Sequence, residues 1–349
     1  MTLLEVESLR TEFPMGEYTI PALDDVSLSV STGEIVGLVG ESGSGKTVLA
    51  ESVLGIVEEP GRVMSGDIRF KGESMLSKTE SELQSVRGSD ISLIFQDPMN
   101  SLNPTITVGE QVAETVRLHQ DIGESVSLGA EFKRKILGAT KDSESWKRSI
   151  EMLETVGIPE PSSRASSYPY EFSGGMRQRA LIAIALSCEP DLLIADEPTT
   201  ALDVTTQAEL LDELETLADT FDTAVLLITH DLAVVAELCE FVYVMYAGEI
   251  VEQARTDRLF RQPQHPYTIG LLDSVPKLNG STELGAIPGD IPEWTGDIEG
   301  CLFAPRCPEA TEECHKKRPS SRSVGDGEHS TACLKRNESH STDLIRQHD

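Results

Sequence analysis

The sequence predicts an α/β protein in which a parallel sheet carries a phosphate-binding loop. Three observations lead to this prediction: a glycine-rich loop stands between an apolar run and a helical pattern, short continuous apolar runs recur later in the chain, and a long helical stretch separates the two regions. Short continuous apolar runs are typical of parallel strands that are covered on both faces.

The glycine-rich loop spans residues 40–47, which read GESGSGKT. An apolar run precedes it and a segment with helical spacing follows it, which is the order of a P-loop. Glycines let successive backbone N–H groups face a phosphate, and the following helix adds its positive end. We therefore expect ATP or GTP to bind here, with Lys46 on the β- and γ-phosphates and the Thr47 hydroxyl on Mg²⁺. The expected nucleotide-binding residues are Gly40, Ser42, Gly43, Ser44, Gly45, Lys46 and Thr47.

The first third of the chain is expected to form strands around this loop. Alternating patterns predict strands at residues 3–6 and 26–30, joined through a turn near Pro14. Residues 66–72 are expected to form a hairpin strand, and residues 91–95 a further strand. From about residue 108 to 186 the apolar spacing is helical.

Buried strands return after Pro190. The runs 192–195 and 225–228 predict parallel strands, joined by a helix near residues 207–217. Residues 241–251 predict a hairpin that turns at Ala247 and Gly248. Beyond about Arg255 the sequence is rich in Pro and Gly with little periodicity, which predicts an appended, irregular domain. The residues after Lys335 are polar and are expected to form a flexible tail.

The bulk composition restricts the partners of the chain. Its 349 residues include 59 acidic and 29 basic ones, so the net charge is −30. Such a surface repels nucleic acid and anionic lipid. Because the acidic residues are distributed along the whole chain, we expect a protein adapted to high salt, which screens self-repulsion. We also expect a cytosolic chain, because the sequence shows neither a signal peptide nor an apolar run long enough for a membrane span.

Several residues are placed to carry out nucleotide chemistry. Asp196 and Glu197 follow a buried strand, where the crevice of such sheets binds ligands. Asp196 would hold Mg²⁺, and Glu197 would polarise the attacking water. Gln96 and His230 also end predicted strands, and they would reach the metal and the γ-phosphate respectively. Taken alone, a single Gln or His at these positions is more often structural.

A second anion-binding turn precedes the helix that begins near residue 174. The residues Ser173, Gly174 and Gly175 place exposed N–H groups at a helix start, which suits a phosphate. The P-loop of the same chain already holds one nucleotide, so this turn would serve a different molecule.

Taken together, these motifs resemble those of the ATP-binding subunits of ABC transporters, and the resemblance covers residues 1–255. It includes the P-loop, the Q-loop at Gln96, the signature 172–176, the Walker B strand that ends at Asp196 and Glu197, the D-loop with Asp203, and the switch histidine His230. The resemblance implies a P-loop NTPase cassette: a RecA-like core with an antiparallel β subdomain and a helical subdomain at about 97–187. It also implies a head-to-tail dimer in which Ser173 and Gly175 contact the partner's γ-phosphate. An aromatic residue that stacks on adenine is expected at Tyr18, with Phe13 as the rival.

Two further segments resemble the dipeptide/oligopeptide (and nickel) importer branch of that family. They are residues 96–104, QDPMNSLNP, and residues 260–268, FRQPQHPYT. The implied domains are a nucleotide-binding domain at 1–255, a small irregular C-terminal cysteine-containing domain at 256–335 and a tail at 336–349.

The six cysteines divide into two groups. Cys188 and Cys239 are expected to be core thiols. A cytosolic compartment argues against disulfides among the others, and their gaps match neither zinc knuckles nor the common ferredoxin spacings, so the residues alone leave metal ligation and unligated thiols open. The segment resembles the cysteine segment of dipeptide-importer ATPases, some of which carry a 4Fe-4S cluster, and this resemblance implies a cluster here. Its ligands would be Cys301, Cys307, Cys314 and Cys333.

The resemblance implies an ATPase that drives the uptake of dipeptides or oligopeptides, with nickel or sugars as alternative cargoes. Its implied partners are a second, paralogous ABC ATPase subunit, two transmembrane permeases and a solute-binding protein, and its implied place is the cytoplasmic face of the membrane. A soluble ABC ATPase that acts on nucleic acid or ribosomes would need basic patches, which the charge of −30 disfavours. A catalytically idle partner would lack the Walker B acid or the switch histidine, and this chain has both.

Overall fold

The computed structural model describes residues 1–95, 101–124, 143–199, 203–274, 287–289, 298–325 and 327–336. The chain divides into two compact units, which are described separately. The first unit comprises Met1, Ser31–Glu34 and Ser77–Leu226, and the second comprises Thr2–Val30, Ile35–Leu76 and Leu227–Asp349. Within the described residues, no helix combines the length and the apolar character that a membrane span requires.

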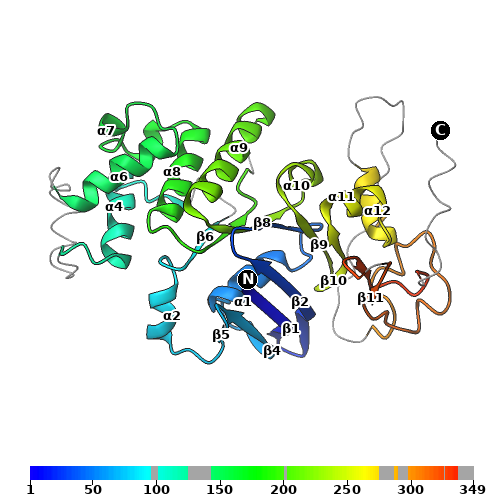
Figure 1. Ribbon diagram of the computed structural model, residues 1–349. Coiled ribbons are helices and arrows are strands. Elements are labelled where there is room, and N and C mark those ends of the chain that lie inside the picture. Colours follow the sequence, from blue (N-terminus) through cyan, green and yellow to red (C-terminus); the bar gives the residue numbers. More distant parts are fainter. Residues whose placement is uncertain are drawn as a thin grey trace. The chain divides into compact units, whose positions relative to one another are not determined.

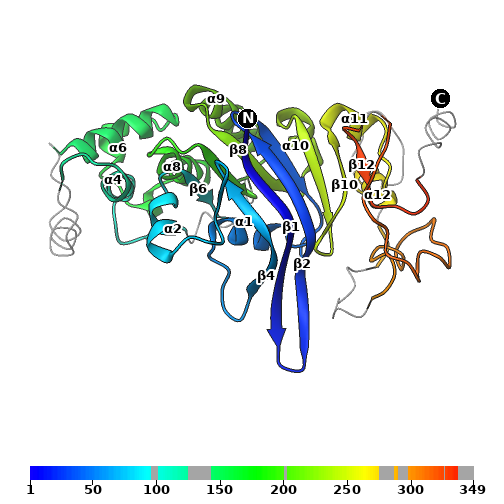
Figure 2. The same ribbon diagram turned by 60° about the horizontal axis from the view of Figure 1, so that its bottom comes forward.

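An antiparallel sheet in the second unit is built from the N-terminal strands. Its order is β2-β1-β4-β5, and Figure 2 shows β1 and β2 as long paired strands. The strands alternate buried and exposed residues, so one face packs on a core that includes Leu4 and Val6. The strands predicted at 3–6 and 26–30 are confirmed and are longer than expected. The bounds are β1 Thr2–Met15, β2 Tyr18–Ser31, β4 Arg62–Phe70 and β5 Glu73–Ser74.

The other strands of the second unit surround β3, which leads into the P-loop. β3 (Ile35–Val39) is buried along its whole length and lies parallel to β9 (Phe241–Tyr246). β10 (Glu249–Arg255) returns from β9 through the predicted turn, where Ala247 and Gly248 both have positive φ, as a tight hairpin requires. β12 (Ser330–Thr331) pairs with β10, and β11 (Arg322–Ser323) pairs with β12. The helices of this unit are α1 Lys46–Leu54, α10 Leu232–Leu238, α11 Thr256–Arg261 and α12 Pro266–Asp273.

The first unit contains the helical region and two parallel strands. β6 (Ile91–Ile94) pairs in parallel with β7 (Leu192–Asp196), and both lie where the sequence predicted strands. α4, α6 and α8 pack together (Figure 1), and Arg117 bonds Glu110 at 2.6 Å inside this bundle. β8 (Ala224–Thr229) begins in this unit and ends in the second one. The helices are α2 Glu80–Val86, α4 Val108–His119, α6 Glu144–Thr155, α7 Pro161–Arg164, the 3-10 turn η1 Pro169–Glu171, α8 Gly174–Leu186 and α9 Val204–Phe221.

The expectation of an irregular region beyond Arg255 is partly wrong. α11 and α12 follow directly, and β12 joins the sheet of β9 and β10. Both helices are only a few residues long, so they offer too few turns for a helical apolar period to be recognised. α12 starts where His265 accepts a hydrogen bond from the Tyr267 N–H, with Pro266 at the first helical position. Residues 298–321 consist of turns and extended segments, as expected.

Candidate nucleotide site

The P-loop lies in the second unit, between β3 and α1. The loop passes so close to β9 that a Cβ on Gly40 would lie 2.2 Å from the Met245 carbonyl oxygen. Gly45 occupies the N-cap of α1 with φ 105°, a conformation that disfavours other residues. No side chain caps this helix start, so its backbone N–H groups keep the geometry that binds phosphate.

The Lys46 side chain bonds back to the first residues of the P-loop. Its ammonium group donates hydrogen bonds to the carbonyl oxygens of Gly40, at 2.8 Å, and Glu41, at 3.0 Å. The residue is 6% exposed. These bonds keep the ammonium group beside the loop backbone. Phosphate oxygens bound in the loop would compete with the two carbonyl oxygens for its hydrogen bonds.

Two residues from the C-terminal region contact the same loop. The Glu41 N–H donates to the Tyr267 hydroxyl at 2.8 Å. The Arg306 guanidinium donates to both Glu41 carboxylate oxygens, at 2.6 and 3.0 Å. The sequence prediction missed both contacts. The only signal is that Tyr267 and Arg306 fall in segments that resemble the importer branch, and no spacing links either one to the P-loop.

Tyr18 and His230, two further predicted nucleotide-site residues of the second unit, are exposed. Tyr18 begins β2 and is 49% exposed, so its ring is available for stacking. The rival Phe13 packs against Gly61, where an added Cβ would lie 2.5 Å from its ring. His230 directly follows β8 and is exposed.

The acidic pair of the first unit lies at the end of β7. Asp196 is the last residue of this buried strand and is 4% exposed. Glu197 turns the chain with φ 48°, an uncommon conformation for a residue other than glycine, which tends to occur at functional sites. The buried Gln178 of α8 donates a hydrogen bond to the Pro198 carbonyl, so α8 holds the turn that carries Glu197.

The signature turn begins α8, and its outer side faces solvent. Ser173 caps the helix by accepting a hydrogen bond from the Met176 N–H at 3.3 Å, and both Ser173 and Gly174 are exposed. A Cβ on Gly175 would lie 2.9 Å from Thr206 of α9. Asp203 caps α9 through two bonds to Thr206, which lower the pKa of its carboxyl group. The structure thus brings the signature turn close to the start of α9.

The predicted site residues divide between the two units. The P-loop, Tyr18 and His230 belong to the second, and Asp196, Glu197, the signature turn and Asp203 belong to the first. Gln96, the predicted Q-loop residue, lies outside the described residues, as do the first two residues of the D-loop, 201 and 202.

The four C-terminal cysteines line one small cavity of the second unit, together with the rings of His265 and Phe303. Burial raises the pKa of the Cys301 thiol to about 11, although the N–H groups of Phe303 and Ala304 partly oppose the shift. Burial likewise raises the pKa of Cys307 and Cys333. In the part of the chain that the structure describes, no three histidine, cysteine or acidic side chains are arranged to hold one metal ion.

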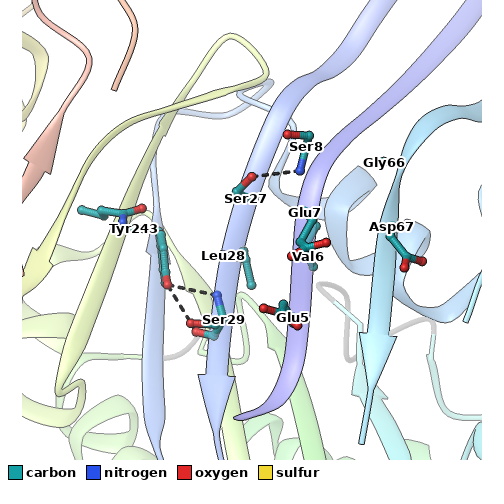
Figure 3. A pocket seen from close by; sticks show the side chains of 11 residues that line it. Glu5, Val6, Glu7, Ser8, Ser27, Leu28, Ser29, Gly66, Asp67 and Tyr243 are labelled. Carbon is teal, nitrogen blue, oxygen red and sulfur yellow. Dashed lines mark hydrogen bonds between the residues drawn. The ribbon is translucent and has the colours of Figure 1, made fainter. Parts of the chain in front are cut away.

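A larger hollow of about 670 Å³ lies elsewhere in the second unit, beside β1, β2 and β4 (Figure 3). Glu5, Glu7 and Asp67 give it an acidic lining, and neither lysine nor arginine lines it. A triphosphate would meet only negative charge there, so this hollow is not a candidate nucleotide site.

Two models of known protein families match the chain. A family model described as ABC transporter matches residues 23–200. A second model, described as the C-terminal region of oligopeptide/dipeptide transporters, matches residues 251–314.

Characterised relatives are similar over nearly the whole chain. The oligopeptide transport ATP-binding protein AppD of Bacillus subtilis is 46% identical over 321 residues, which cover 91% of this chain and 92% of that protein. The dipeptide transport ATP-binding protein DppD of Escherichia coli is 43% identical over 331 residues, with coverage of 95% and 96%. Among solved structures, the dimer of MJ0796, a bacterial ABC transporter cassette, matches with a TM-score of 0.61 at 26% identity, over 73% of this chain and 99% of that one.

Proposed function

Because this chain belongs to the family of ABC transporter ATP-binding proteins, we propose that it binds and hydrolyses ATP to drive an importer of dipeptides or oligopeptides. The observation that carries this function is the pairing, in one chain, of an ABC cassette with the C-terminal region of peptide transporters. The chain is then a peripheral subunit at the cytoplasmic face of the membrane, where it attaches through permeases.

The residues of the second unit would bind the nucleotide. The P-loop backbone and the first turn of α1 would surround the β- and γ-phosphates, and Lys46 would exchange its bonds to the loop carbonyls for phosphate oxygens. Thr47, at the start of α1, would ligate Mg²⁺ through its hydroxyl group. The exposed ring of Tyr18 would stack on adenine.

The residues of the first unit would carry out hydrolysis. Asp196 would hold Mg²⁺ through water, and Gln96 would reach the same ion. The ion, when bound, neutralises charge on the β- and γ-phosphate oxygens. Glu197 would accept a proton from the attacking water, and His230 would donate a hydrogen bond to the γ-phosphate as it leaves.

A second ATPase subunit would complete each site. The exposed Ser173 and Gly174 agree with this, because a turn that contacts another molecule's triphosphate must face solvent. In a head-to-tail dimer, Ser173, Gly175 and Asp203 would lie across the interface from the partner's P-loop. We propose that this partner is a paralogous ATPase, and that two permeases and a solute-binding protein complete the importer.

The test is ATP turnover in the assembled importer. Glu197→Gln should lower kcat at least about a hundredfold and leave ATP binding intact, because it removes the proton acceptor and not a phosphate ligand. Glu189→Gln is the matched control: Glu189 is also a glutamate with positive φ, at 52°, but it precedes β7 instead of following it.

Turnover should rise when the binding protein is loaded with a di- or oligopeptide. Stimulation by nickel or a sugar in place of peptides would reassign the cargo. Equal turnover in the Glu197→Gln and Glu189→Gln proteins would contradict the hydrolytic mechanism.

We further propose that Cys301, Cys307, Cys314 and Cys333 hold a 4Fe-4S cluster. The donor set supports this, because four thiols line one cavity and Cys301 receives backbone N–H bonds, which stabilise cluster sulfurs. Such a cluster uses one cysteine per iron, so its ligands need not converge on a single ion. The cluster would supply a structural link or a redox centre.

Anaerobic purification tests the cluster. We expect iron and acid-labile sulfide in equal amounts, close to four of each per chain for a 4Fe-4S centre, together with sulfur-to-iron charge-transfer absorbance that Cys307→Ser abolishes. Cys188→Ser is the matched control, because Cys188 is a half-buried thiol outside the cavity. Zinc in place of iron, or no metal at all, would overturn the proposal.

We also infer that the chain is adapted to high salt, because its 59 acidic residues far outnumber its 29 basic ones.

A further inference from the structure

Glu41, the second residue of the P-loop, is held through three different groups. Its backbone N–H donates to Tyr267, its carboxylate accepts two hydrogen bonds from Arg306, and its carbonyl oxygen accepts from the Lys46 ammonium group at 3.0 Å. Two of these three partners come from the C-terminal region, more than 220 residues away in sequence. The position of Glu41 therefore depends on residues outside the cassette motifs.

Contacts other than the one with Glu41 also hold the Arg306 side chain in place. Its side chain is 5% exposed, and its Nε donates to the Pro288 carbonyl oxygen at 2.9 Å. Its guanidinium carbon lies 5.8 Å from the centre of the Tyr246 ring. The other contacts already orient the guanidinium. Its two bonds therefore restrict the position of the Glu41 carboxylate and cost little additional side-chain entropy.

Tyr267 is fixed by packing. It is fully buried, and its ring centre lies 4.7 Å from that of Tyr246 and 5.5 Å from that of Phe303. The hydroxyl group is consequently directed at the Glu41 N–H by a rigid aromatic cluster.

We infer that Tyr267 and Arg306 are positioning residues that hold the P-loop in its phosphate-binding form. Through the N–H and the carboxylate of Glu41 they hold the loop segment whose carbonyl oxygens, those of Gly40 and Glu41, accept hydrogen bonds from Lys46. The inference rests on the proposed function, since it assumes that this loop binds nucleotide. It gives the C-terminal region a part in nucleotide affinity that is exerted through Glu41.

The test is the affinity of the full chain for MgADP, measured by calorimetry, because ADP engages the P-loop without turnover. Arg306→Gln should raise the Kd about tenfold, since it removes a charge-assisted bidentate bond. Arg306→Lys should recover part of this loss, because it keeps the charge and one bond. Tyr267→Phe should raise the Kd about threefold, since it removes a single hydrogen bond and keeps the ring.

Two matched controls separate positioning from stability. Arg318 also ties the C-terminal region to the rest of the unit, through Glu249 at 2.7 Å and Asp24 at 2.9 Å. Tyr243 also uses its hydroxyl group on backbone, accepting from the Ser29 N–H at 3.0 Å. None of these bonds is to a residue of the P-loop, so Arg318→Gln and Tyr243→Phe should lower the melting temperature as much as their counterparts and leave the Kd within about twofold.

A double-variant cycle isolates the pair itself. Glu41→Gln combined with Arg306→Gln should weaken MgADP binding no more than Arg306→Gln alone, because both changes break the same bond.

The inference is wrong if Arg318→Gln changes the Kd as much as Arg306→Gln, or if Tyr267→Phe and Tyr243→Phe have equal effects. If Arg306→Gln does not fold, Arg306→Lys and Tyr267→Phe decide the question. Failure of the unaltered chain to bind MgADP would instead refute the proposed function.

Discussion

Asp196 and Glu197 are adjacent carboxylates that the fold places in different environments. Asp196 ends a buried strand and is 4% exposed, whereas Glu197 leaves the strand through a left-handed turn at φ 48°. A buried carboxylate is suited to a divalent cation, which compensates its charge, and a turn residue is suited to reach a water molecule. The two environments agree with the roles proposed for the two carboxylates.

The aromatic residue that recognises adenine is predicted to be Tyr18. Tyr18→Ala should raise the Kd for MgATP about tenfold, because stacking on a base contributes about 1–3 kcal/mol. Tyr18→Trp should keep the affinity, and binding of inorganic tripolyphosphate should not change in either variant. Phe13→Ala should lower stability instead, since its ring packs against Gly61. Weaker binding in Phe13→Ala, with none in Tyr18→Ala, would transfer the role to Phe13.

The sequence predicted those strands and turns that depend on interactions between neighbouring residues. The continuous apolar runs predicted β7 and β8, and the turn at Ala247 and Gly248 predicted the β9–β10 hairpin. Both predictions depend only on neighbouring residues, through burial and through turn chemistry. The short α12 was missed. The bond between Arg306 and Glu41 joins residues 265 positions apart. No local pattern predicts such a pair, since only the tertiary fold brings the two together.

The start of α12 should make stability depend on pH. Burial lowers the pKa of His265 to about 4, and the nearby Glu252 carboxylate opposes the shift only in part. The folded state therefore holds this imidazole neutral, whereas the unfolded chain binds a proton below about pH 6.5. The stability from this group is complete above that pH and is lost as the pH falls toward 4.

Urea unfolding at pH 7 and pH 5 measures this effect. His265 should account for a loss on the order of 2 kcal/mol between the two, and His265→Asn should remove that part of the slope, because asparagine caps a helix without titrating. The exposed His315 is the control, and His315→Asn should leave the slope unchanged. An identical slope in both variants would contradict the assignment.

Negative charge is the dominant feature of the chain. A net charge of −30 places every surface element in a repulsive field. α9 illustrates this with exposed acids at three-residue spacing, Glu209, Asp212 and Glu215, which lie on one face of the helix and repel one another. The same field disfavours nucleic acid as a partner, in agreement with an importer subunit.

Salt should therefore stabilise the folded chain. Raising KCl from 0.1 to 2 M shortens the screening length from about 10 Å to below about 3 Å, so the free energy of unfolding should increase with KCl. The variant Glu209→Gln/Asp212→Asn/Glu215→Gln should be more stable than the unaltered chain by about 0.5–1 kcal/mol in low salt, because like charges one turn apart are removed. This gain should vanish in 2 M KCl, where the repulsion is already screened. A gain that persists at high salt would show that helix propensity, and not charge, limits stability, and full stability of the unaltered chain at 0.1 M KCl would remove the case for adaptation to salt.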